Sequence, residues 1–239
     1  MQNKKSFSFI FIILCLAQFA FGQSAKEFYV AGNMKLETHR YSEAVIDFSK
    51  AIKKDKNYVE AYSQRALCYE MLNNFKRAVQ DYTKIIKINS NNTAAYISRG
   101  LIFRKQNKYT EAIADFTKCI EIRKDYPFAY QHRAETYMLI NDFEKAKSDF
   151  LILLKYFPNN AKALTSLSEI YLLENDNLQA LISINVAIEN NPNDGDLFFI
   201  RAKIYKNQND IKNACIDLQK AKSMGISKVE DLILEWCKD

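Results

Sequence analysis

Residues 99–122 read RGLIFRKQNKYTEAIADFTKCIEI, and this stretch decides the fold. A small residue, Gly100, is followed three positions later by the aromatic Phe103. Ala112 is followed four positions later by the aromatic Phe116. Such spacings place apolar side chains on one stripe of a helix. The stretch therefore predicts two amphipathic helices joined by a short turn, with a small residue in each allowing the two helices to approach closely.

The same pattern returns every 34 residues along the chain. The alanine recurs as Ala44, Ala78, Ala112, Ala146, Ala180 and Ala214. The small residue twelve positions earlier recurs as Gly32, Ala66, Gly100, Ala134, Ser168 and Ala202. The large residue four positions after the alanine recurs as Phe48, Tyr82, Phe116, Phe150, Ile184 and Leu218. A fixed period of this length is typical of units that bury their apolar faces by stacking on their neighbours.

The turn between the two helices of each unit has its own signature. The residue five positions before each alanine is Asn73, Asn107, Asn141, Asn175 or Asn209. Asn tolerates the left-handed backbone conformation that ends a helix. His39 holds this place in the first unit, which favours a turn residue over a metal ligand or a catalytic base. Pro127, Pro158 and Pro192 fall between units, where a helix must end.

The period of 34, the small and aromatic residues of the first helix, and the alanine and aromatic residue of the second make the chain similar to tetratricopeptide repeat proteins. The resemblance covers residues 25–226. It implies an all-α, right-handed superhelical solenoid of six helix-turn-helix repeats. The expected repeats are 25–58, 59–92, 93–126, 127–160, 161–194 and 195–228. Val229, Leu232, Ile233 and Trp236 have helical spacing, which predicts a capping helix over 229–239.

A pair of opposite charges also follows the repeat. Arg65, Arg99, Arg133 and Arg201 each have an acid sixteen residues later, namely Asp81, Asp115, Asp149 and Asp217. The fifth repeat has lost both members and has Leu167 and Ser183 instead. This joint presence and absence predicts structural ion pairs between the two helices of one repeat. The alternative is a row of arginines that binds an anionic ligand.

The resemblance places partner binding on the concave surface, which is formed by the first helix of each repeat. The corresponding residues here are Leu67, Met71, Ile97, Leu101, Arg104, Phe128, Gln131, Glu135, Met138, Thr165, Glu169 and Leu172. This strip favours an apolar helix or strand of a partner protein. One branch of the family binds chaperone tails through basic residues and Asn. The positions equivalent to these tail-binding residues hold Tyr29, Asn33, Gln64, Ala94 and Ser98 here. Only Asn33 is the residue type that this branch uses.

Composition excludes several classes of function. The formal net charge of +6 is spread along the chain, which argues against a nucleic-acid-binding patch. The two histidines, His39 and His132, are far apart in sequence, and no catalytic or phosphate-binding motif is present. We therefore expect neither an enzyme nor a bound metal or cofactor.

Cys68, Cys119, Cys215 and Cys237 show no metal-binding spacing. They are expected to act as small buried hydrophobic residues, with a Cys215–Cys237 disulfide as the alternative in an oxidising compartment.

Residues 1–22 have the parts of a secretory signal peptide. Lys4 and Lys5 precede an apolar run over 7–21, which ends in small residues. The run is shorter than the roughly 20 residues that a membrane-spanning helix needs. We therefore expect cleavage after Gly22 and a secreted or periplasmic chain, with an uncleaved membrane anchor or a lipidated Cys15 as alternatives.

The sequence as a whole predicts a non-enzymatic scaffold or adaptor of the cell envelope that binds a partner protein or peptide. No membrane span is expected once the signal is removed. The alternatives are a structural homo-oligomer and, with less support, an enzyme or small-molecule binder.

Overall fold

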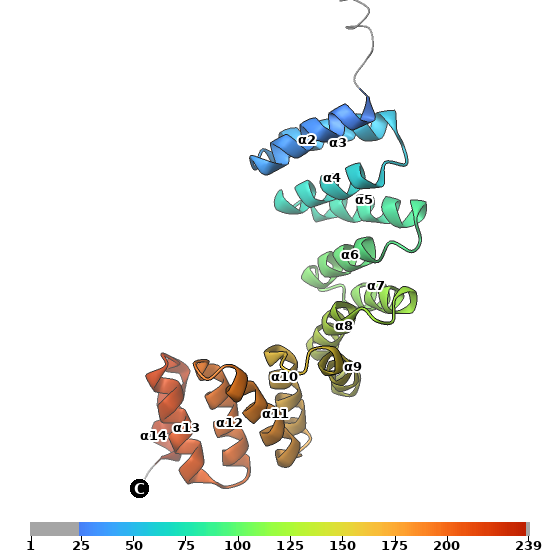
Figure 1. The fold of residues 1–239 in the computed structure, drawn as a ribbon. Helices are drawn as coiled ribbons and strands as arrows, with labels where there is room; N and C mark the ends of the chain where they lie inside the picture. Colours follow the sequence, from blue (N-terminus) through green and yellow to red (C-terminus); the bar gives the residue numbers. More distant parts are fainter. Residues whose placement is uncertain (1–23, 238–239) are drawn as a thin grey trace, which may run out of the picture. The chain divides into compact units, whose positions relative to one another are not determined.

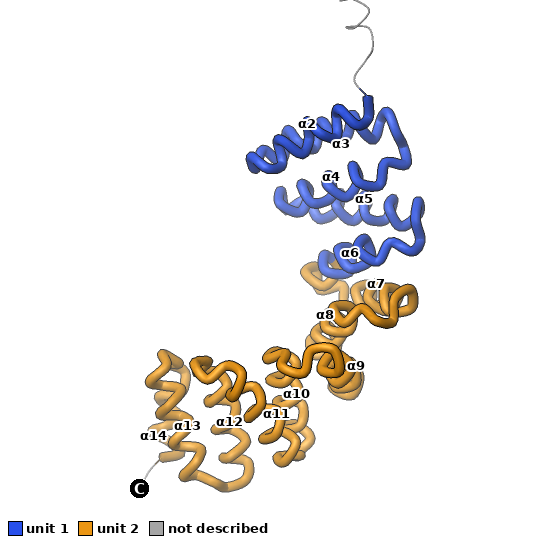
Figure 2. The backbone as a smooth tube through the Cα atoms, in the orientation of Figure 1, with its two compact units in different colours: residues 1–102 blue, residues 103–239 orange. Residues whose placement is uncertain are grey.

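The computed structural model of the protein describes residues 24–237. The predicted signal peptide and its cleavage site lie outside these residues. The chain divides into two compact units, residues 1–102 and 103–239, which are coloured separately in Figure 2.

Unit 1 is built from helices joined by short turns (Figure 1). They are α2 (Ala25–Glu37), α3 (Tyr41–Lys54), α4 (Val59–Met71), α5 (Phe75–Ile88) and the first part of α6 (Thr93–Lys105). In sequence order, α2 and α3 form the first helix pair and α4 and α5 the second. We call the first helix of each pair helix A and the second helix B. Helix α4 packs on both α3 and α5, so consecutive pairs stack.

Unit 2 continues the same arrangement. After the end of α6 it contains α7 (Tyr109–Ile122), α8 (Pro127–Leu139), α9 (Phe143–Tyr156), α10 (Ala161–Leu173), α11 (Asn177–Asn190), α12 (Gly195–Asn207), α13 (Ile211–Ser223), the 3-10 turn η1 (Ser227–Val229) and α14 (Glu230–Trp236). No strand occurs between residues 24 and 237. The predicted all-α solenoid of stacked helix pairs is therefore confirmed.

A residue with a left-handed backbone lies two positions after the last residue of each helix A. The positive φ angles lie between 55° and 61° at His39, Asn73, Asn107, Asn141, Asn175 and Asn209. These are the six positions that the sequence predicted as turn residues. In four repeats the next residue caps helix B, because the side chains of Asn74, Asp142, Asp176 and Asp210 accept a hydrogen bond from the backbone N–H three residues later.

Small residues hold the two helices of a pair together. Ala44, Ala66, Ala134 and Ala146 are fully buried. In the first pair the contact is closer still, because a Cβ added to Gly32 would lie 2.6 Å from the ring of Phe48. The aromatic side chains beside these contacts form the core, and Phe48, Phe116 and Phe150 have no exposed surface. Burying side chains of this size contributes most of the stability of such a helix pair.

The C-terminal helix covers the end of unit 2, as the sequence predicted. Val229 is fully buried, and Leu232, Ile233 and Trp236 pack against the cluster that contains Phe198. A disulfide between Cys215 and Cys237 joins α13 to the end of α14.

The disulfide corrects the expectation that all four cysteines are small buried hydrophobic residues. Cys68 and Cys119 are free and buried, as expected, but Cys215 and Cys237 are covalently paired. The residues lie 22 positions apart in sequence. They become neighbours only because the chain folds back at η1, a turn that the repeat period does not predict.

Candidate partner-binding surface

The predicted strip of partner-binding residues lies on helices A, and none of its members is buried. Leu67 and Met71 on α4 are 40% and 52% exposed, and Phe128 on α8 is 48% exposed. Because the buried side of each helix A faces helix B and the neighbouring repeat, these side chains occupy the side that the solenoid leaves open. Leu67, Met71, Ile97 and Leu101 belong to unit 1, and the other eight belong to unit 2.

Unit 2 contains a hollow on this side, formed by three consecutive helices A. It has a volume of about 280 Å³ and is lined by Arg104, Glu135, Met138, Leu139, Phe150, Lys162 and Ser166. Phe150 comes from helix B α9 and is fully buried, so it forms the apolar base. Arg104, Glu135 and Met138 were predicted from the sequence. Lys162 and Ser166 were not, because the resemblance gave no reason to select them from α10.

Glu135 is the centre of a charged cluster at the rim of this hollow. Its Oε2 accepts a hydrogen bond from Arg104 Nη1 at 2.6 Å, and its Oε1 accepts one from Gln131 Nε2 at 3.1 Å. Lys162 Nζ lies 3.1 Å from Oε1, and His132 Nδ1 lies 3.8 Å from Oε2. The cluster thus joins α6, α8 and α10 through a single carboxylate.

The cluster has a clear effect on the titration of Glu135. Burial acts to raise the pKa of its carboxyl group, because the charged form loses hydration. The polar contacts with His132, Gln131, Lys162 and Arg104 act in the opposite direction and together outweigh burial. The pKa of Glu135 therefore lies well below its usual range. Two permanent cations face one carboxylate here, so the rim has a small excess of positive charge.

The other predicted residues of unit 2 lie outside the hollow. Thr165, Glu169 and Leu172 are half-buried on α10 and do not line it. Phe128 lies at the start of α8, where its ring centroid is 5.9 Å from that of Tyr126 and 5.8 Å from that of Phe157. Phe128 therefore belongs to a separate aromatic edge, formed by the loops between repeats.

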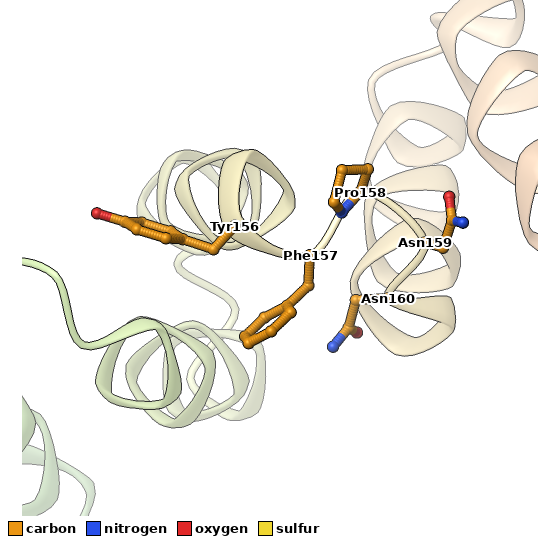
Figure 3. A pocket seen from close by; sticks show the side chains of 5 residues that line it. All are labelled: Tyr156, Phe157, Pro158, Asn159 and Asn160. Carbon is orange, nitrogen blue, oxygen red and sulfur yellow. The ribbon is translucent and has the colours of Figure 1, made fainter.

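This aromatic edge borders a second, shallow hollow of about 460 Å³, lined by Tyr156, Phe157, Pro158, Asn159 and Asn160. Figure 3 shows Phe157 beside Asn160, with the Tyr156 side chain directed away from both. Tyr156 and Phe157 are 46% and 40% exposed. The repeat does not require an aromatic residue at Phe157, because the equivalent positions hold Asp55, Asn89, Arg123 and Asn191.

The arginines selected from the sequence serve the scaffold. Arg133 Nε and Nη2 donate to the two carboxylate oxygens of Asp149, both at 2.8 Å. Arg65 with Asp81 and Arg201 with Asp217 have the same bidentate geometry. The remaining predicted pair, Arg99 and Asp115, has one member in each unit and stays a prediction.

Each of these guanidinium groups is further enclosed by rings and by a third helix. Arg133 lies 5.8 Å from the Tyr130 ring and 5.9 Å from the Tyr137 ring. Its Nη1 donates to Thr117 Oγ1 at 3.0 Å, on helix B of the preceding repeat. The carboxylate raises the pKa of Arg133, although burial opposes it. Because its three nitrogens each donate a hydrogen bond within the scaffold and two rings lie near it, the group is poorly placed to bind an anionic ligand.

The architecture has a counterpart in known sequences. Sequence models of the tetratricopeptide repeat match residues 59–92, 93–126, 133–195 and 195–224. The chain belongs to the tetratricopeptide repeat family. A comparison with curated proteins gives no significant match.

Solved structures share this tetratricopeptide repeat fold at low sequence identity. The C-terminal part of a repeat protein from Cytophaga hutchinsonii is 20% identical over 87% of this chain and 84% of its own, with a TM-score of 0.73. PilF of Pseudomonas aeruginosa is 16% identical over 90% and 97%, with a TM-score of 0.70. YrrB, described as having an unusual peptide-binding site, is 20% identical over 79% and 96%, with a TM-score of 0.69.

Between residues 24 and 237, no group of three or more His, Cys, Asp or Glu side chains is arranged to hold a metal ion. Over the same residues, every helix falls short of the length or the apolar character needed to cross a membrane.

Proposed function

We propose that this protein is a non-enzymatic adaptor, and that it binds a segment of a partner protein on the exposed side of its helices A. The observation that carries this proposal is the hollow around Glu135 in unit 2. Residues of three consecutive helices A line it, so a single bound segment can contact three repeats at once. Proteins of this family generally act as interaction modules, which supports a binding role over a catalytic one.

The chemistry of the hollow favours a segment with an apolar side chain flanked by polar groups. Met138 and Leu139 offer flexible apolar surface over the Phe150 ring, and Leu139 is 54% exposed. Arg104, Glu135 and Lys162 form a polar rim that can align the backbone of the bound segment. This matches the apolar helix or strand that the sequence predicts as a ligand. YrrB supports the proposal as a protein of the same fold that is described as having a peptide-binding site.

We further propose that the adaptor works outside the cytoplasm, in the periplasm or at the cell surface. The Cys215–Cys237 disulfide supports this location, since such bonds persist in oxidising compartments and are rare in the cytosol. The basic and apolar residues before Gly22 support it independently, as a signal for export. Alkylation of free thiols in intact cells, before any lysis, would test the location. A reduced Cys215–Cys237 pair in vivo would contradict it.

Site-specific photo-crosslinking in living cells tests the adaptor role directly. A photoreactive amino acid at Ser166 would place the reactive group in the hollow without disturbing the core. We expect covalent adducts with a defined partner protein, identified by mass spectrometry. The matched control carries the same amino acid at Ile216, which is 54% exposed on helix B α13.

A substitution in the hollow tests whether the crosslinked partner binds there. Met138→Asp should abolish the Ser166 adduct while leaving the helical circular dichroism unchanged, because Met138 is only half-buried. Equal adducts from Ser166 and Ile216, or adducts that survive Met138→Asp, would show that binding does not use the hollow.

A further inference from the structure

The first helix of the array has an apolar side that no described residue covers. In the later repeats, the residue equivalent to Met34 is buried against the preceding repeat. These residues are Cys68, Ile102, Thr136, Ile170 and Ile204, and none is more than 2% exposed. Met34 itself is 63% exposed. The position thus keeps its apolar character while lacking the helix that covers it elsewhere.

Met34 is part of a larger surface, which we call the end face. It is lined by Ser24, Lys26, Glu27, Val30, Ala31 and Met34, around a hollow of about 460 Å³. Val30 is 48% exposed at its centre. No residue between 25 and 102 fills this hollow, since α2 packs with α3 and α4 on its other sides. Figure 1 shows α2 at the end of unit 1 away from α6.

The first repeat lacks the residues that would receive another repeat of the same kind. In four later repeats an arginine of helix A reaches a polar side chain on the preceding helix B, as Arg65 reaches Ser49 at 2.9 Å. The first repeat has Ala31 in place of that arginine. Its acid, Asp47, is bound instead by Lys35 and Lys50 from within the repeat. The end face therefore lacks the polar contact by which Arg65, Arg99, Arg133 and Arg201 hold the preceding repeat.

The charges beside the end face are complementary to one another. Lys26 and Glu37 are both exposed on α2 and lie eleven residues apart, which is close to three helical turns. They therefore flank the apolar centre on the same side, one near each end. When two copies of α2 pack in antiparallel fashion, Lys26 of each copy meets Glu37 of the other, while Val30 and Met34 pack across the two-fold axis.

We infer that a second copy of this chain binds the end face through an antiparallel α2–α2 contact. A two-fold contact uses the same surface on both copies and is closed. The opposite end of the chain cannot extend the assembly in the same way, because α14 covers the last repeat and the Cys215–Cys237 disulfide holds it there. The expected product is a dimer of two protein copies, and no longer filament. The surface is distinct from the hollow around Glu135.

Sedimentation velocity over a wide range of protein concentration tests this inference. The protein would be purified after expression from its complete coding sequence, and its N-terminal residue determined by mass spectrometry. We expect a monomer–dimer equilibrium without larger species. Met34→Glu should weaken dimerisation by about tenfold or more, because it places a charge beside Val30 of the other copy in the apolar centre of the contact. The matched control is Leu234→Glu at the capped end, where Leu234 is 71% exposed.

A charge exchange tests the antiparallel arrangement. Lys26→Glu and Glu37→Lys should each weaken the dimer, and the double variant should restore it. Neither change should disturb folding, since each gives an end of α2 the charge that suits the helix dipole. The inference is overturned by a wild-type chain that stays monomeric, whatever residues precede Ser24. It is also overturned by a dimer lost in Leu234→Glu but kept in Met34→Glu, or by a double variant that is not restored.

Discussion

Arg133 donates a hydrogen bond to Thr117 across the boundary between two consecutive repeats, with Nη1 and Oγ1 3.0 Å apart. The same relationship joins Arg65 to Ser49 and Arg201 to Asn185, in each case over sixteen residues. In the fifth repeat the arginine is replaced by Leu167, and the residue sixteen positions earlier is Leu151. Donor and acceptor have thus been lost together. We conclude that each arginine connects its own repeat to the one before it.

The Arg133–Thr117 bond should contribute measurably to stability. Thr117→Val keeps the shape of the side chain but removes the acceptor, and so leaves one donor of a charged group unpaired. We expect the free energy of unfolding to fall by roughly 1–3 kcal/mol in urea titration. Thr110→Val, at an exposed position of the same helix, is the control and should change it by less than about 0.5 kcal/mol. An equal effect of both variants would contradict the proposed contact.

The fifth repeat provides a design for replacing the whole network. Asp149→Ala alone leaves the half-buried Arg133 without its carboxylate and should cost about 3–5 kcal/mol. The triple variant Thr117→Leu, Arg133→Leu, Asp149→Ser copies the fifth repeat and leaves no charge unpaired. We expect it to be more stable than Asp149→Ala, as measured by urea unfolding. A triple variant less stable than the single one would show that the network cannot be exchanged as a set.

The low pKa of Glu135 predicts how the stability of the fold changes in acid. The folded chain holds this carboxyl group below its ordinary pKa of 4.5, so the ionised form is the one that stabilises the fold. Its contribution is complete above that ordinary value and is lost as the pH falls through the lower, folded value. Glu135→Gln should therefore reduce stability by roughly 1–3 kcal/mol at pH 7, and the gap to wild type should narrow towards pH 3. A gap that does not change with pH would contradict this.

Reduction of the Cys215–Cys237 disulfide should loosen α14 before the rest of the chain unfolds. The bond closes a loop of about 22 residues, for which chain entropy predicts a contribution of about 3 kcal/mol. Trp236, the only tryptophan of the sequence, packs beside this bond and serves as the reporter. We expect its fluorescence to shift to longer wavelength on reduction while circular dichroism changes little. A fluorescence shift accompanied by loss of the helical circular dichroism would indicate that α14 is required for the folding of the whole unit.

The two free cysteines of the core should be unreactive in the folded protein. Burial raises the pKa of both Cys68 and Cys119 to about 11, so little of the reactive thiolate is present at neutral pH. A thiol reagent should modify neither residue until denaturant is added, and then should modify both. Cys68→Ala and Cys119→Ala variants assign the two reactions. Rapid modification of native protein would show that these helices open easily.

The repeat period explains why the fold could be predicted from the sequence. The turn residues Asn73 and Asn141 and the core residues Ala112 and Phe150 have roles that every repeat demands, so their recurrence reveals them. The capping helix was predictable from helical spacing alone. These features follow from local backbone preference and from packing between neighbours, and both are visible as a pattern in one sequence.

Features that occur once were harder to predict. Lys162 contacts Glu135 from the next helix A, and nothing in its own repeat marks it for that role. The disulfide depends on a chain reversal after the last repeat. Phe157 was missed as a surface residue, although its position holds polar residues in other repeats, which was a signal available in the sequence. A periodic pattern identifies what the scaffold needs, and departures from it identify the residues that remain to be explained.

The hydrogen bond between Arg133 and Thr117 also limits how the repeats can be ordered. Removal of 161–194 would place Leu151 opposite Arg201, which would then lack an acceptor. Removal of 127–160 would leave the Thr117 hydroxyl against Leu167. Removal of both segments, 127–160 and 161–194, would bring Thr117 next to Arg201, so that the donor would again have an acceptor. The repeats share one length, yet they are not interchangeable. Each junction needs either a donor and an acceptor or two apolar residues, and only some pairs of repeats match.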